Sequence, residues 1–328
     1  MLKNSKLLIP SLLLISAILV IVSLGFGYYK LNLRDVFNYI FGTSTDPFAK
    51  QVIENIRLPR VLSAFFIGLS LSASGAAYQG VFKNPLVSPD ILGVASGCSM
   101  GAALAILLDL SYFYIQLFSF GFGLITVAIT YALSINIRSS MKIAMILTGT
   151  MIGSLCFSII TLMKYFADVN DQLPEITYWI AGSLSKTSST AILFSLPFMV
   201  VGFLILYFMS NRINVLTLSK DEALSLGINV KLNMRIVILA STMMCSGAVS
   251  LGGQIMWIGL MIPHIARGLV GNNYRKLLPV SALIGGIFLL LVDNTIRSLF
   301  MMELPIGLLI SFIGAPFFYM LIKKGGLK

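Results

Sequence analysis

The chain has 328 residues, of which 57% are hydrophobic and only 11% charged. A soluble globular protein carries about a quarter charged residues, so this composition excludes a soluble protein and indicates an integral membrane protein. The formal net charge of +11 could suit a nucleic-acid-binding protein, but the basic residues lie in short loops between apolar segments, and we expect no nucleic-acid partner.

Apolar segments long enough to cross a bilayer recur through the whole chain. A transmembrane helix needs about 20 predominantly apolar residues. About ten segments meet this requirement, near 7–28, 61–80, 91–108, 112–133, 142–163, 190–209, 234–251, 254–271, 277–296 and 304–322. No remaining segment is long enough for a separate soluble domain. We therefore predict a single all-α transmembrane domain, 1–328, in a lipid bilayer.

The first span has a second interpretation as a secretory signal, since Lys3 and Lys6 precede its apolar run. We expect a retained span, because no small-x-small cleavage site follows and the run is long enough to cross the membrane. With the N-terminus in the cytoplasm, the inner loops hold nearly twice as many Lys and Arg residues as the outer loops. This bias is typical of the positive-inside rule, and it predicts both termini in the cytoplasm.

The residue types that bind metals are scarce. His264 is the only histidine of the chain, and the cysteines are isolated within predicted spans at Cys98, Cys156 and Cys245. Zinc and other transition metals generally need several such ligands together, so we predict no metal site. Pro263 removes a helix hydrogen bond, and a ring nitrogen of His264 could satisfy a freed backbone group. We expect a structural role for both residues, with a gating role for His264 as the alternative.

A charged residue within the membrane is costly and therefore informative. Asp293 lies in the ninth predicted span, and Arg297 follows four residues later on the same helix face. We favour a structural ion pair over a proton relay, because no other span offers a clear second carboxylate or proton path. The chain also lacks the GxxxxGK[ST] motif of a P-loop ATPase. An energy source outside this chain is therefore predicted, and an ion-coupled secondary transporter is the weaker alternative.

The long inner segment 210–233 carries the signature of a short surface helix. Ser219 suits an N-cap, Glu222 stands at the capping-box position, and Gly227 suits the stop after the last turn. This pattern is compatible with a contact for an external motor or with an interfacial linker.

Several longer motifs together resemble one known family. RLPRVLSAFFIGLSLSASGAAYQGVFKNPLVSPDILGVASG occupies 57–97, and further motifs follow in order: YWIAGSLS at 178–185, LSKDEALSLGINV at 218–230, GLMIPHIARGLVG at 259–271, RKLLPVSALIGG at 275–286 and ELPIGLLISFIGAPFF at 303–318. Over essentially its full length the chain is similar to FecCD-type permeases of ABC importers for iron chelates, haem and vitamin B12.

The resemblance implies a vitamin-B12-importer-like permease fold of about ten transmembrane helices in the bacterial cytoplasmic membrane. It implies a permease dimer, made with a second copy or a related permease, together with two cytoplasmic ABC ATPase subunits and an external substrate-binding protein. The chain itself would have no catalytic residue and no directly bound cofactor, since the partner ATPase uses the ATP. The implied cargo is an iron chelate, most often a ferric siderophore, with haem or vitamin B12 as alternatives.

The family also assigns roles to particular positions. The segment 217–230 corresponds to the cytoplasmic coupling helix, although Ser219 and Lys220 depart from the usual glycine and acidic residue. Contact with the ATPase is implied for Asp221, Glu222, Ala223, Leu226 and Gly227. Docking of the binding protein is implied for Arg57, Arg60 and Arg297, which could instead be interface anchors. The inner gate is implied at Ser139, Ser140 and Met141.

An intramembrane enzyme is the third class considered. It would need a nucleophile and a base, or a metal set, within the membrane. One histidine and one aspartate in separate spans do not form such a set, so we predict no enzymatic activity.

Overall fold

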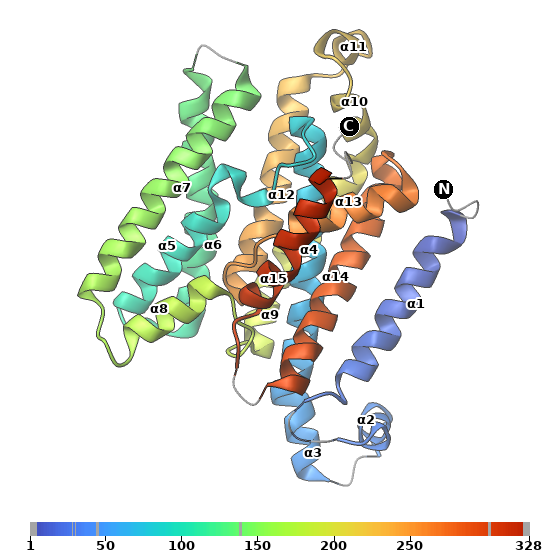
Figure 1. The fold of residues 1–328 in the computed structure, drawn as a ribbon, viewed down its shortest axis with the longest axis vertical. Helices are drawn as coiled ribbons and strands as arrows, with labels where there is room; N and C mark the ends of the chain where they lie inside the picture. Colours follow the sequence, from blue (N-terminus) through green and yellow to red (C-terminus); the bar gives the residue numbers. More distant parts are fainter. Residues whose placement is uncertain are drawn as a thin grey trace.

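The computed structural model describes residues 5–27, 29, 31–43, 46–137, 140–300 and 303–323, and all regular structure in this part of the chain is helical (Figure 1). Each of the predicted spans corresponds to a helix: α1 (Ser5–Ser23), α4 (Leu58–Phe82), α5 (Val94–Leu107), α6 (Tyr112–Ile135), α7 (Met141–Phe166), α9 (Ser189–Phe208), α12 (Val230–Gly252), α13 (Ile258–Val270), α14 (Tyr274–Leu299) and α15 (Ile306–Lys323). The all-α membrane fold predicted from the sequence is confirmed.

These helices differ in length, and only some of them are long enough to cross a bilayer. Among the described residues, 6 helical segments are long and apolar enough to cross a membrane, and they contain α4, α6, α7, α9, α12 and α14. The helices α1, α5, α13 and α15 are apolar but shorter. A short helix can still lie within the membrane. Neighbouring helices can then satisfy the backbone N–H and C=O groups of the non-helical residues at its ends.

Short helices mark the two ends of the bundle. One end carries α2 (Leu33–Ile40), α3 (Pro47–Val52) and α8 (Gln172–Ala181), and the π-helical turn η1 (Ile53–Arg57) joins α3 to α4. We call it the α3 end. The opposite end carries α10 (Ser210–Leu216) and α11 (Lys220–Ser225), and we call it the α11 end (Figure 1).

The centre of the bundle is α4, which packs against α12, α13 and α14. Small residues make this packing close. A Cβ atom on Gly68 would lie 2.2 Å from the carbonyl oxygen of Gly285 in α14. Close backbone approach of this kind supplies the packing contacts between helices in lipid, where no hydrophobic drive brings helices together.

Two predicted spans begin later than expected. The chain reverses after Lys83, passes through the 3-10 helix η2 (Pro89–Leu92) and enters α5 only at Val94. Likewise α13 begins at Ile258 rather than near 254, because Gly253 adopts a φ of 70° and ends α12. The residues directly before the two helices, Ile91 and Leu92 and the segment 255–257, are apolar, so hydropathy does not separate them from the spans.

Candidate functional site

The predicted capping box of the segment 217–230 is present. The Ser219 Oγ accepts a hydrogen bond from the backbone N–H of Glu222 at 3.2 Å, and the Ser219 N–H donates to Glu222 Oε2 at 2.8 Å. Gly227 follows with a φ of 72°, which favours glycine. These local bonds cap α11, which makes few tertiary contacts with the rest of the chain.

The surface of α11 combines acidic and apolar side chains. Ala223 is buried against the rest of the chain, whereas Leu224 and Leu226 are 52% and 61% exposed. Asp221 and Glu222 are exposed in the first turn. Hydrogen bonds from the side chain and backbone of Ser219 lower the pKa of Glu222, so this carboxylate is charged at neutral pH. The element stands beyond the bundle at the α11 end, where another protein can reach it (Figure 1).

At the α3 end, Asp293 lies between two arginines. Arg60 Nε donates to Asp293 Oδ1 at 2.9 Å. Arg297 Nε lies 2.8 Å from Asp293 Oδ2, an ion pair without hydrogen-bond alignment. The pairing of Asp293 with Arg297 was expected from their spacing, but the second partner, Arg60, was not. Because Asp293 is fully buried, the two guanidinium groups are what makes its charge tolerable there.

A fourth charged residue, Glu303, extends this network toward the surface. Its Oε1 accepts a hydrogen bond from Arg60 Nη1 at 3.1 Å, and its side chain is 53% exposed. The sequence analysis missed Glu303 because no local pattern connects it with a residue in α4.

Arg57 is buried without a carboxylate partner among the described residues. It is 3% exposed and donates to the backbone carbonyl oxygens of Leu24, at 2.6 Å, and Tyr29. Arg57, Arg60, Arg297 and Glu303 line a recess of about 360 Å³ at the α3 end, which we call the arginine recess. The three arginines predicted for docking are therefore brought together. The recess thus gathers three guanidinium groups and one lining carboxylate, and two of the guanidinium groups also contact the buried Asp293.

The residues predicted for the inner gate lie at the junction of α6 and α7. The Ser140 Oγ accepts a hydrogen bond from the Ile143 N–H at 3.4 Å and caps α7, of which Met141 is the first residue. Ser139 lies outside the described residues. A capped helix start is thus present at this position, and its role as a gate stays a prediction.

His264 and Pro263 lie in α13, where Pro263 is buried and His264 is partly exposed. Within the described ranges His264 makes no hydrogen bond, so the suggested bond to a backbone group freed by Pro263 is not formed. The same residues include no group of three or more His, Cys, Asp and Glu side chains that could hold a metal ion. The three cysteines are buried and form no disulfide.

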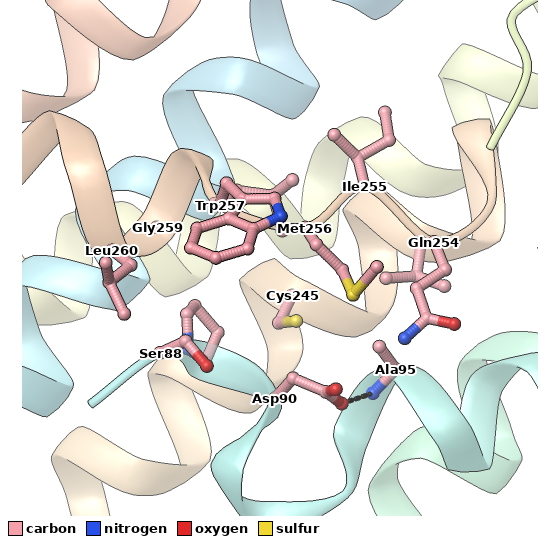
Figure 2. Close-up of a pocket in the computed structure, with 13 residues that line it drawn as sticks. Ser88, Asp90, Ala95, Cys245, Gln254, Ile255, Met256, Trp257, Gly259 and Leu260 are labelled. Carbon is pink, nitrogen blue, oxygen red and sulfur yellow. Dashed lines mark hydrogen bonds between the residues drawn. The ribbon is translucent and has the colours of Figure 1, made fainter. Parts of the chain in front are cut away.

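A cavity of about 220 Å³ lies inside the bundle, between the turn that precedes α5 and the turn that precedes α13 (Figure 2). Its polar lining side chains are those of Ser88, Asp90, Cys245, Gln254 and Trp257. Asp90 Oδ1 accepts a hydrogen bond from the Ala95 N–H at 3.0 Å, so its charge faces the positive N-terminal end of α5. This carboxylate was missed as an interior charge, since it lies just before the predicted span 91–108.

Comparison with known proteins shows the family to which this chain belongs. The FecCD transport family matches residues 13–324 of the chain. The chain belongs to this family. It is 37% identical over 327 residues to the molybdate import system permease protein MolB of Haemophilus influenzae, covering 97% of this chain and 96% of that protein. It is 35% identical to a probable iron chelatin transport system permease of Helicobacter pylori, covering 94% and 95% of the two chains.

The fold agrees with that of a solved ABC transporter. A metal-chelate type ABC transporter in an inward-facing conformation superposes with a TM-score of 0.86 at 34% identity, over 98% of this chain and 99% of the other. The chain is therefore an integral membrane permease of an ABC importer. The relatives named for molybdate, iron chelatin and hemin differ in cargo, so membership of the FecCD family does not identify the cargo.

Proposed function

We propose that this permease imports a ferric siderophore, taking it from an external binding protein and releasing it into the cytoplasm with energy from ATP. The observation that carries the proposal is the capped α11 at one end of a FecCD permease whose other end holds the arginine recess. The relatives named for iron chelatin and metal chelates support a chelated iron cargo.

In this proposal α11 is the contact for the ATPase. Two cytoplasmic ABC ATPases would each receive one α11 of a permease dimer, formed with a second copy or a related permease. The exposed Leu226 would enter the ATPase surface beside Asp221 and Glu222, while Ala223 and Gly227 hold the turn in place. Because the capping box fixes the turn, closure of the ATPases would move it as a rigid body.

The arginine recess would receive the binding protein. Arg57, Arg60 and Arg297 offer guanidinium groups that bind carboxylates through paired hydrogen bonds and stay charged at every physiological pH. This assignment puts the α3 end outside and the α11 end, with both termini, in the cytoplasm. The permease would bind no cofactor directly, and the partner ATPases would use the ATP. Ser139, Ser140 and Met141 would narrow the inner end of the path.

Several relatives are named for cargoes other than a ferric siderophore. Haem and cobalamin are the cargoes named for relatives from Yersinia pestis and Halobacterium salinarum. Molybdate is favoured by the Haemophilus relative, which is 37% identical to this chain.

The test is uptake of radiolabelled ferrichrome, ferric enterobactin, haem, cobalamin and molybdate by cells with and without this permease. Each cargo is measured with and without an uncoupler that leaves ATP intact. We expect the uptake of one ferric siderophore to be lost in the deletion strain. In cells that have the permease, this uptake should be insensitive to the uncoupler. If the deletion instead abolished uptake of molybdate, haem or cobalamin, that compound would be the cargo in place of a ferric siderophore. Permease-dependent uptake that collapses with the ion gradient would show a secondary transporter and overturn the proposal.

A further inference from the structure

Glu303 lies at the boundary between two recesses of the α3 end. It lines the arginine recess, and it also lines a second recess of about 460 Å³ that includes Tyr178 and Trp179 of α8 and Gly253. A side chain shared by both recesses can respond to a ligand in one and alter the other.

The two carboxylates that contact Arg60 differ greatly in how firmly they are held. Asp293 is fully buried and contacts both Arg60 and Arg297, so its release would leave a buried charge without a partner. Glu303 is half-exposed, and among the described residues it forms an ion pair only with Arg60. Ion pairs that are exposed to solvent contribute little to stability. Of the two, Glu303 is therefore the carboxylate that another acid can replace.

The position of Glu303 connects this contact to two helices of the α3 end. Glu303 stands three residues before α15, whose first N–H, that of Ile306, donates to the carbonyl oxygen of Gly182 at 2.8 Å. Gly182 directly follows α8, and a Cβ atom on Gly307 would lie 2.4 Å from the carbonyl oxygen of Ala181. The start of α15 is thus attached to α4 through Glu303 and to α8 through its backbone.

We propose that Glu303 forms an ion pair with Arg60 in the free permease and so takes the place of a carboxylate of the binding protein. Docking exchanges the two carboxylates and releases the segment before α15 from α4, next to the end of α8. The inference rests on the proposed docking at the arginine recess. A carboxylate is the expected ligand because Arg57 has only backbone carbonyl oxygens as partners in the described structure.

The exchange makes a prediction that a purely structural ion pair does not make. If Glu303 competes with the incoming carboxylate, removing its charge strengthens docking. If Glu303 only supports the shape of the recess, removing its charge weakens docking or leaves it unchanged.

The experiment uses the permease with its ATPase subunits in phospholipid nanodiscs. The probe is the cargo-loaded binding protein whose deletion abolishes uptake of that cargo in the same cells. Its half-saturating concentration is measured by surface plasmon resonance and by stimulation of ATP hydrolysis. We expect Glu303→Gln to lower this concentration about two- to fivefold, the range that an exposed ion pair supplies.

The matched control is Glu54→Gln. Glu54 also lies at the α3 end in a partly exposed ion pair, 3.9 Å from Lys50, but it does not contact Arg60. We expect Glu54→Gln to leave docking unchanged. Equal affinity of Glu303→Gln and the unmodified permease, or weaker docking by the variant, would overturn the exchange.

A second pair of variants separates the exchange from the docking on which it rests. Arg60→Lys retains the charge and loses the planar fork, and Arg57→Gln removes the guanidinium that lacks a carboxylate. If both variants dock as tightly as the unmodified permease, the proposed docking site is itself wrong. If they dock more weakly while Glu303→Gln is unchanged, docking stands and only the exchange is refuted.

Discussion

Gly75 and Gly259 bring the backbones of α4 and α13 into direct contact. A Cβ atom on Gly75 would lie 1.9 Å from the carbonyl oxygen of Gly259, and one on Gly259 would lie 2.5 Å from the Pro89 ring. The contact is between backbone atoms, so no side-chain rotation can relieve an added methyl group. The position of α13, and with it one wall of the central cavity, depends on both residues remaining glycine.

Replacing Gly75 by alanine should destabilise the permease by about 1–3 kcal/mol, the usual cost of overpacking a core. The measurement is thermal unfolding of the purified protein in detergent. Gly121→Ala is the matched control, because a Cβ atom there meets no atom within 4 Å. Equal unfolding temperatures for the two variants would contradict the backbone contact.

Replacing Asp293 by asparagine should destabilise the α3 end more than any change at Glu303. The substitution leaves Arg60 and Arg297 without the buried charge between them, which costs about 3–5 kcal/mol. Glu303→Gln should cost less than about 1 kcal/mol, because that pair is half-exposed. Chemical denaturation of both variants provides the comparison, and similar losses would show that Asp293 does not hold the network together.

The sequence predicts those parts of this molecule that depend on neighbouring residues. The spans follow from runs of apolar residues, and α11 follows from Ser219 and Glu222, three positions apart. The residues directly before α5 and α13 are apolar, at Ile91 and Leu92 and at 255–257, so hydropathy extended both predicted helices. The contact between Arg60 and Asp293 joins residues 233 positions apart, and no local pattern signals it. Only the packing of α4 on α14 brings them together.

The double variant Glu222→Ala and Leu226→Ala should abolish ATP-driven uptake while membrane insertion stays intact. It removes the capping carboxylate and an exposed leucine from α11, and neither side chain supports the bundle. Ser225→Ala is the control, since within the described structure the Ser225 hydroxyl donates only to the carbonyl oxygen of Asp221 in the same helix. Copurification of the ATPase and cargo uptake are measured together. Normal uptake by the double variant would remove the coupling assignment.

His264→Gln should retain most of the uptake. His264 makes no hydrogen bond with the described residues, and these residues hold no cluster of metal ligands around it. Uptake of the identified cargo, normalised to the amount of permease in the membrane, measures the effect. A loss of about tenfold or more, in a variant that still unfolds at the normal temperature, would favour the alternative role in gating.

The order of α11 should depend on pH through Glu222. Bonds from Ser219 lower the pKa of this carboxyl in the folded turn, so its capping contribution is fully present at neutral pH. The contribution decreases below the ordinary pKa of 4.5 and is lost as the pH falls through the lowered value. Protection of the Glu222 and Ala223 amides against hydrogen exchange, corrected for intrinsic rates, should decrease over this range. In Glu222→Gln the protection should be lower at neutral pH and insensitive to acid, and an equal acid response in both proteins would assign the effect to another group.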